Sequence, residues 1–165
     1  MSKTIIATYE HVEAANRAIR RLYEDGFTQP QISLLVSDPT KEKHLAIKPG
    51  TKASEGVAAG AAAGGALGAI AVGLTAVAGI VIPGLGLSIA GPLVAALAGL
   101  GAGATAGGLV GGLVGLGISE HEAKVVEDAV KQGNVALAVT DDDADRIEIV
   151  HGVFQSTGAL TITKQ

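Results

Sequence analysis

The sequence contains no cysteine, no tryptophan and only 2% aromatic residues. Without cysteine the chain has no disulfide framework, no thiolate ligand for a metal and no cysteine nucleophile. The net charge of −4 lacks the basic excess of proteins that bind nucleic acid, so we expect no nucleic-acid partner. Nevertheless 48% of the residues are hydrophobic, which excludes a chain that is disordered because it lacks apolar residues.

Charge is missing altogether from one continuous block of the chain. From Gly56 to Ile118, 63 consecutive residues include no Asp, Glu, Lys, Arg or His, and they hold 19 of the 24 glycines. We expect the polar parts on either side, residues 1–55 and 119–165, to form one α/β domain together. Residues 56–118 would then be an apolar insertion into that domain.

The first polar part has the pattern of a strand, a helix and a second strand. An apolar run predicts a strand over 4–8, and an amphipathic stripe predicts a helix over 11–25 that Gly26 ends. A second apolar run predicts a strand over 32–37. The N-terminus leads directly into the first strand, so we expect no signal peptide.

The second polar part repeats this arrangement after an additional helix. Ser119 and Glu122 have the spacing of a capping box, which predicts a helix over 119–132 closed by Gly133. The elements that follow are a strand over 135–140, a helix opened by the acidic run Asp141–Asp143 and ended by Gly158, and a strand over 159–163. This order predicts an α+β fold: a ferredoxin-like βαβ/βαβ sandwich interrupted by a long Gly/Ala-rich α-helical hydrophobic hairpin.

The apolar block has the length and the breakers of a helical hairpin. Segments 56–81 and 93–117 would each exceed the ~30 Å core of a bilayer as helices. The predicted bend contains the breakers Pro83, Gly84, Gly91 and Pro92. Glycine recurs every fourth residue on both arms, at Gly56, Gly60, Gly64 and Gly68 and at Gly99, Gly103, Gly107, Gly111 and Gly115. Such a stripe lets two helix backbones approach closely, so the spacing predicts a glycine zipper.

Other features of the block leave its surroundings open. The bend over 82–91 is uncharged, and no aromatic belt marks either end, which suits a hairpin that dips into one leaflet or one buried in a self-assembled oligomer. Four lysines precede the block: Lys41, Lys43, Lys48 and Lys52. They favour a cytoplasmic domain and contact with anionic lipid headgroups. The alternative for these lysines is a solvated linker.

Motifs that carry chemistry are missing from the sequence. The four histidines have no metal-binding spacing. Asp141, Asp142, Asp143 and Asp145 lack the glycine and terminal glutamate of an EF-hand loop, which favours helix capping over calcium binding. The glycine-rich block contains no phosphate-binding loop and Ser119 no nucleophile motif. We therefore expect no enzyme, no metal and no cofactor.

Two stretches of the chain carry a resemblance to a known family. They are TIIATYEHVEAANRAIRRLYEDGFTQPQISLLVSD and GPLVAALAGLGAGATAGGLVGGLVGLGISEHEAKVVEDAVKQGNVALAV. In them the chain resembles bacterial and archaeal general-stress proteins of the YflT (heat-induced stress protein) type. The resemblance covers most of residues 3–140 and weakens over the last strand. It implies a ferredoxin-like fold and an association with stress or membranes, and it brings no catalytic residues.

These observations lead to one main functional hypothesis and two alternatives. The main hypothesis is a non-enzymatic, membrane-associated, stress-related structural protein that forms homo-oligomers through its glycine-zipper hairpins. The first alternative is a soluble, cytoplasmic particle or filament that sequesters its hairpins, with or without lipid or another apolar cargo, inside a polar shell. The second is a pore, which the shortage of polar residues in the block disfavours.

Overall fold

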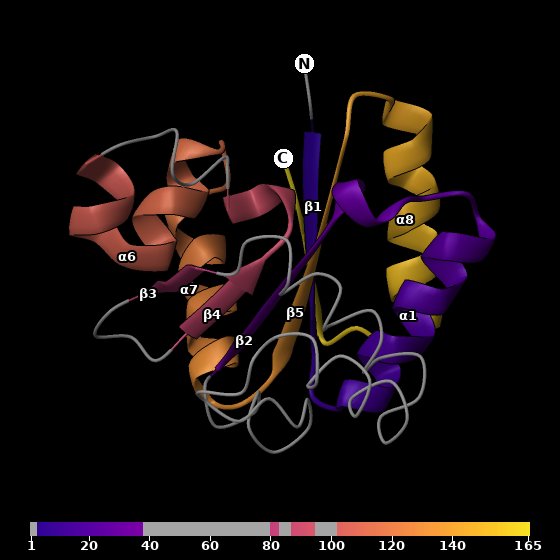
Figure 1. Cartoon of the computed structure of the whole chain (residues 1–165), viewed down its shortest axis with the longest axis horizontal. Coiled ribbons are helices and arrows are strands. Elements are labelled where there is room, and N and C mark those ends of the chain that lie inside the picture. The colour runs from indigo at the N-terminus through magenta and orange to yellow at the C-terminus, as the bar shows by residue number, and fades with distance from the viewer. Residues whose placement is uncertain (1–2, 38–79, 83–86, 95–101) are drawn as a thin grey trace, which may run out of the picture.

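The computed structural model describes residues 3–37, 80–82, 87–94 and 102–165. These residues form an α+β fold in which helices lie on both sides of one sheet (Figure 1). The elements are β1 (Lys3–Tyr9), α1 (Val12–Glu24), the 3-10 helix η1 (Gln29–Gln31), β2 (Ile32–Ser37), β3 (Ile80–Ile82), β4 (Leu87–Ala90), α6 (Ala102–Gly115), α7 (Glu120–Lys131), β5 (Val135–Asp141), α8 (Ala144–Ser156) and β6 (Thr161–Lys164).

The described sheet has six strands in the order β3-β4-β2-β5-β1-β6, and each neighbouring pair is antiparallel. Strand β5 therefore lies between β1 and β2, which are parallel to each other. Helix α1 connects β1 to β2, and α8 connects β5 to β6. The first and last segments of the chain thus supply the centre and one edge of the sheet.

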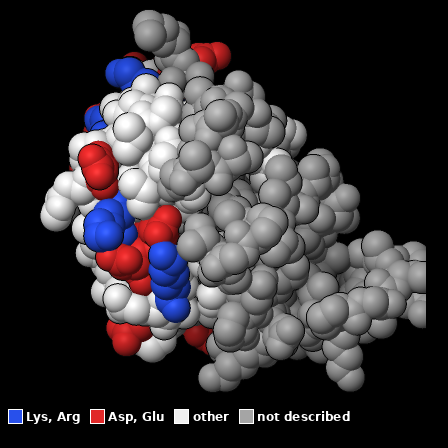
Figure 2. Space-filling model, turned by 90° about the vertical axis from the view of Figure 1, so that its left-hand side faces the viewer, with Lys and Arg blue, Asp and Glu red and all other residues white. Residues whose placement is uncertain are grey.

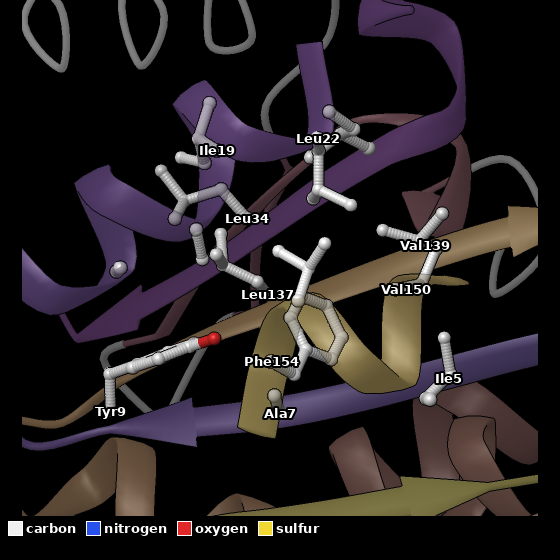
Figure 3. Packing of buried hydrophobic residues seen from close by; sticks show 14 of the residues in the cluster. Ile5, Ala7, Tyr9, Ile19, Leu22, Leu34, Leu137, Val139, Val150 and Phe154 are labelled. Atoms are coloured by element: carbon white, nitrogen blue, oxygen red, sulfur yellow. The ribbon is translucent and has the colours of Figure 1, made fainter. Parts of the chain in front are cut away.

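One face of the sheet is covered by α1 and α8. Tyr9 and Phe154 meet edge to face, with their ring centroids 6.3 Å apart. Figure 3 shows the surrounding apolar side chains, which include Ile5, Ala7, Ile19, Leu22, Leu34, Leu137, Val139 and Val150. The Tyr9 hydroxyl bonds Thr157 at 3.0 Å, and burial raises its pKa to about 12. This layer is the main core of the protein.

The opposite face is covered by α6 and α7. Its buried residues come from the sheet, from α7 and from the apolar block, and include Ile6, Leu35, Leu87, Ile89, Leu109, Leu113, Val126 and Val130. With a layer of helices on each face, β2 and the first five residues of β5 are buried throughout. This explains why these strands are almost continuously apolar and do not alternate with polar residues.

Four described helices end in the same way, with a glycine in left-handed backbone. Gly26, Gly117, Gly133 and Gly158 have φ between 81° and 99° and follow α1, α6, α7 and α8. After α1, Phe27 N–H donates to the Leu22 carbonyl and Gly26 N–H to that of Tyr23, which is the Schellman pattern. The predicted helix ends at Gly26, Gly133 and Gly158 are therefore confirmed.

The elements predicted for the two polar parts are confirmed within about two residues. The predicted helices over 11–25 and 119–132 are α1 and α7, and the predicted strand over 32–37 is β2. Ser119 caps α7 by accepting from Glu122 N–H at 3.3 Å, while its own hydroxyl donates to the Glu122 carboxylate. The α+β class is confirmed as well.

The predicted helical hairpin is not confirmed, because the apolar block forms strands at and next to its predicted bend. Residues 80–82 and 87–90 are the strands β3 and β4, and β4 pairs with β2. The chain does reverse direction between them, but the segments on either side are strands. A short uncharged run of Ile, Val and Leu fits a buried strand as well as a buried helix, so periodicity could not distinguish the two.

The second predicted arm, 93–117, is also interrupted. Within α6, Gly108 has φ 60° and ψ −146°, a conformation that only glycine adopts readily and that breaks the helix into two parts. No helix in the described ranges combines the length and the apolar character needed to cross a bilayer. The first predicted arm, apart from its last two residues, lies outside the described residues.

Candidate functional site

The candidate site for self-association is the outer side of α6, after its break at Gly108. Leu109, Gly112 and Leu113 are buried against the rest of the protein. On the other side of this helix Gly111 is half-buried, Gly115 is exposed and Val114 is 42% exposed. We call these last three residues the α6 outer face. Because residues three and four apart share one side of a helix, they form one contiguous surface.

Two members of the predicted glycine stripe thus have a described surface position. Gly111 and Gly115 belong to the α6 outer face, and Gly103 and Gly107 lie within the bounds of α6. The other predicted packing residues lie outside the described residues; they are Gly56, Gly60, Gly64, Gly68 and Gly99. The described part of the stripe leaves the backbone of α6 open to a close neighbour.

A partly buried carboxylate holds the second part of α6 in place. A helix that starts again after a break has free N–H groups in its first turn. One of them, Val110 N–H, donates to Glu127 Oε2 of α7 at 3.2 Å, and the Glu127 side chain is only 13% exposed. Lys131 forms an ion pair with the same carboxylate. A negative charge at this position also stabilises the helix dipole.

The sequence did not single out Glu127, although it contains a signal for this role. Ala123, Val126 and Val130 form the buried stripe of α7, and Glu127 lies on the same side of the helix. A charged residue at the border of a buried stripe needs a partner. The partner is a backbone amide of a different helix, which the sequence alone does not reveal.

The predicted bend residues have different positions. Pro83 and Gly84 lie outside the described residues, whereas Gly91 and Pro92 follow β4 directly. Gly91 has φ 100°, and a Cβ there would lie 2.4 Å from the Ile32 carbonyl oxygen, so only glycine fits against β2. The buried Ser33 hydroxyl of β2 accepts from Leu93 N–H at 2.9 Å. These contacts fix the chain that leaves β4 against the sheet.

The face that carries α6 and α7 shows no patch of a single charge sign among its described residues (Figure 2). Figure 2 views the molecule from the side on which α6 and α7 lie in Figure 1, and its basic and acidic side chains lie next to one another. The predicted headgroup-binding residues, Lys41, Lys43, Lys48 and Lys52, lie outside the described residues.

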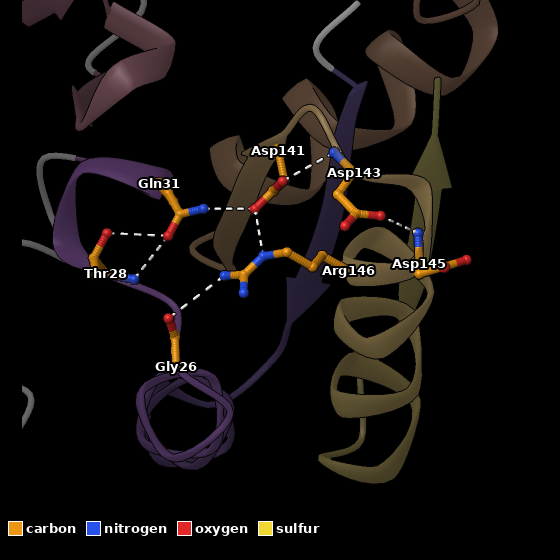
Figure 4. A network of polar contacts seen from close by, with 7 residues as sticks. All are labelled: Gly26, Thr28, Gln31, Asp141, Asp143, Asp145 and Arg146. Carbon is orange, nitrogen blue, oxygen red and sulfur yellow. Dashed lines mark hydrogen bonds and ion pairs between the residues drawn. The ribbon is translucent and has the colours of Figure 1, made fainter.

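The most extensive polar network lies at the opposite helix layer and surrounds Asp141 (Figure 4). Its Oδ2 atom accepts from Gln31 Nε2 at 2.6 Å and from Arg146 Nε at 2.8 Å, and its Oδ1 atom accepts from Asp143 N–H at 3.0 Å. Burial alone would raise the pKa of Asp141. The bonds from Asp143 and Arg146 favour the charged form more strongly, so this pKa lies below its usual range.

Arg146 joins this network to the turn after α1. Its guanidinium lies 4.2 Å from the centre of the Phe27 ring and donates to the Gly26 carbonyl at 3.5 Å. The network therefore connects the end of β5, the start of α8 and the α1–β2 turn. Its hydrogen bonds run between these three parts of the chain and hold them together, which is a structural role.

The acidic run has the predicted capping role. Asp143 is the N-cap of α8 and accepts from Asp145 N–H at 2.9 Å. No three His, Cys, Asp or Glu side chains gather as metal ligands in the described parts of the chain. The described geometry thus offers a packing surface on α6 and a structural network at Asp141. Comparison with protein-family models, with curated proteins and with solved structures found no match for this chain.

Proposed function

We propose that this protein is a non-enzymatic structural protein that self-associates at a membrane through its glycine-rich apolar block. The observation that carries the proposal is the α6 outer face, where Gly111 and Gly115 flank the exposed Val114. Side chains do not separate two backbones at glycine positions, so a second helix can approach closely and gain dispersion and Cα–H···O contacts. The partner at this surface is another copy of the same chain.

The cost of the glycines supports this proposal. Each glycine inside a helix costs roughly 1 kcal/mol relative to alanine in water. Gly111 and Gly115 do not have a positive φ, unlike Gly117, so their backbone conformation does not require glycine. In the proposed oligomer, glycine at these positions allows another helix to pack closely against α6.

We also infer that the four strands β2-β5-β1-β6 and the helices α1 and α8 form a ferredoxin-like unit. The support is the strand order together with two crossover helices on one face. In this interpretation β3, β4, α6 and α7 are additions that extend the sheet and cover its second face. Membership of the YflT-type stress family, with a stress-related role, is part of the same proposal.

A soluble assembly is the second candidate function. It uses the same α6 outer face but encloses the apolar surface in a particle or filament, with lipid or another apolar cargo inside. The burial of Leu87, Leu109 and Leu113 in the core supports this alternative, because these parts of the apolar block pack against protein. In the membrane form the polar domain is cytoplasmic and Lys41, Lys43, Lys48 and Lys52 contact lipid headgroups.

The test compares two substitutions of the same kind at exposed helical glycines. Gly115→Leu fills the α6 outer face, whereas Gly152→Leu adds the same side chain to α8, where a new Cβ meets open space. We expect Gly115→Leu to reduce the size of the detergent-free assembly in sedimentation, and Gly152→Leu to leave it unchanged. Unchanged size in Gly115→Leu would show that this face is not used.

Flotation with liposomes distinguishes the two candidate functions. The membrane protein floats with vesicles that contain anionic lipid, and the soluble assembly stays at the bottom of the gradient at its full size. A chain that is monomeric and does not float would contradict both candidates.

A further inference from the structure

The interruption of helix α6 involves a single residue. Gly108 has φ 60° and ψ −146°, and it is the only residue inside α6 with dihedral angles that are not helical. We call residues 102–107 the first part of α6 and residues 109–115 its second part. Glycine adopts both positive and negative φ without a steric penalty. A change of conformation at Gly108 would therefore be enough to make α6 continuous.

The second part of α6 is fixed to the rest of the protein. Leu109 and Leu113 are fully buried in the core layer below α6 and α7. Just after the helix, Gly117 lies so close to the side chain of Gln165 that a Cβ at Gly117 would be 2.6 Å from Gln165 Nε2. A change at Gly108 would thus turn the first part of α6 and leave the second part in its place.

One backbone amide has a different acceptor in the broken and the continuous helix. In a continuous helix the Val110 N–H donates to the Ala106 carbonyl, four residues earlier. Gly108 lies between these two residues, and its dihedral angles are incompatible with that bond. In the structure the Val110 N–H donates to Glu127 Oε2, and Lys131 pairs with the other oxygen of this carboxylate. Glu127 and the Ala106 carbonyl therefore compete for one donor.

The glycine spacing fits the continuous helix. Gly103, Gly107, Gly111 and Gly115 recur every four residues across the break. Residues at this spacing follow one side of a helix only when the helix is continuous. The break changes the direction of the chain between the second and third of these glycines, so the broken helix has two short stripes in place of one long stripe.

We propose that α6 is a two-state helix that Glu127 keeps broken in the single chain and that self-association makes continuous over residues 102–115. In the continuous state the Val110 N–H passes from Glu127 to the Ala106 carbonyl, and the four glycines form one stripe about 18 Å long. A second copy of the chain favours this state because the longer stripe offers it more surface for close packing. This inference rests on the proposed function, whose packing surface it places under conformational control.

Hydrogen exchange at the Val110 amide tests the competition between the two acceptors. Glu127→Ala is combined with Gly108→Ala, and all chains carry Gly115→Leu so that association through the α6 outer face does not contribute. With Gly108 present, Glu127→Ala should accelerate exchange about tenfold. In the Gly108→Ala chain it should accelerate exchange less than about twofold, because alanine disfavours the broken form and the Ala106 carbonyl becomes the acceptor.

Two results of this exchange experiment would overturn the two-state helix. One is an equal acceleration by Glu127→Ala in the two backgrounds. The other is fast exchange at Val110 in the Gly108→Ala chain itself, because the amide would then have gained no acceptor within the helix.

The handedness of one methyl group tests whether the break controls association. Mirror symmetry makes φ 60° and ψ −146° a favourable conformation for a D-residue, whereas an L-residue favours the right-handed helix. Chains with L-alanine or D-alanine at residue 108, prepared by chemical ligation, therefore favour opposite states of α6. In detergent-free sedimentation we expect larger assemblies than the native chain for L-alanine and smaller ones for D-alanine. Equal sizes for the two chains would overturn control by the break.

A control variant and one comparison complete the design. Gly158→Ala adds L-alanine at φ +86° after α8, on the other face of the sheet, and should change neither Val110 exchange nor assembly size. If Gly115→Leu reduces assembly size but the two alanine chains are equal, the proposed function stands and this inference fails. If the alanine chains differ but Gly115→Leu has no effect, the break controls association through another surface and the proposed α6 outer face is wrong.

Discussion

Glycine has opposite consequences at two positions of α8. Gly152 lies inside the helix, where a methyl group meets open space, and Gly158 ends it with φ +86°. We expect Gly152→Ala to raise the free energy of unfolding by roughly 0.5–1 kcal/mol, because alanine favours the helix. Gly158→Ala should lower it by about 1–2 kcal/mol, because a Cβ is disfavoured in left-handed backbone. Urea denaturation measures both, and changes of equal sign would contradict these roles.

Asp141 stabilises the fold in a manner that depends on pH. Its pKa is lowered in the folded protein, so its contribution is fully present above the unfolded pKa of about 4 and is lost as the pH falls through the folded value. We expect Asp141→Asn to lower the free energy of unfolding by about 1–3 kcal/mol at pH 7, because the bonds from Gln31 and Arg146 lose a charged acceptor.

The pH series for Asp141 has a matched control on the neighbouring residue. Asp142→Asn removes the same charge from an exposed side chain outside the network. The difference between wild type and Asp141→Asn should shrink as urea denaturation is repeated at successively lower pH below 4. A difference that stays constant with pH, or one matched by Asp142→Asn, would disagree with this role of Asp141.

At the scale of elements, the join between α6 and α7 depends on one carboxylate. Glu127→Ala leaves Val110 N–H without its acceptor, and we expect a loss of about 1–2 kcal/mol in the free energy of unfolding. Lys131→Ala removes the ion pair and keeps this bond, so its cost should be near 0.5 kcal/mol. Hydrogen exchange at the Val110 amide should accelerate in Glu127→Ala alone. Equal acceleration in Lys131→Ala would assign the effect to the ion pair.

Elements with a local signal could be predicted closely from the sequence. Helix α1 has an apolar stripe and a glycine stop, and α7 has Ser119 as its cap, so each carries its own boundaries. Strands β3 and β4 have no such signal, because their identity depends on pairing with β2. An uncharged run can be buried in a sheet as well as in lipid. Only pairing with a neighbouring strand distinguishes these two environments.

The candidate site was predictable only in part, for the same physical reason. The four-residue spacing of glycine predicts close packing at Gly111 and Gly115. Both lie on the side of α6 away from the core, and their packing against another helix stays a prediction. The cap from Glu127 is a contact between two helices, and no local pattern in the sequence reveals it. Nor does any local pattern reveal the break at Gly108. The spacing of glycines alone does not reveal which one will interrupt the helix.

At the scale of the whole molecule, helix layers on both faces explain the composition of the polar parts. Strands β1, β2 and β5 have their side chains buried on both faces of the sheet, so most of their positions are apolar. The buried polar residues of β1 and β2 are the small residues Thr4, Thr8, Ser33 and Ser37. The second layer comes largely from the apolar block and α7. The described part of the block therefore contributes to the core of the folded unit.

The pairing of β4 with both β2 and β3 has a consequence for the intervening chain. Ser37 at the end of β2 pairs with Leu87, and Ile80 at the start of β3 pairs with Ile89, two residues further along β4. Ser37 and Ile80 are thus separated by two strand spacings and two residues, about 12 Å. The sheet thus holds Ser37 and Ile80, the residues on either side of 38–79, close to each other. A linker of a few residues spans that gap, and loop length changes the closure entropy only slowly. The pairing of β2, β4 and β3 therefore fixes the positions of Ser37 and Ile80 but sets no length for the sequence that joins them.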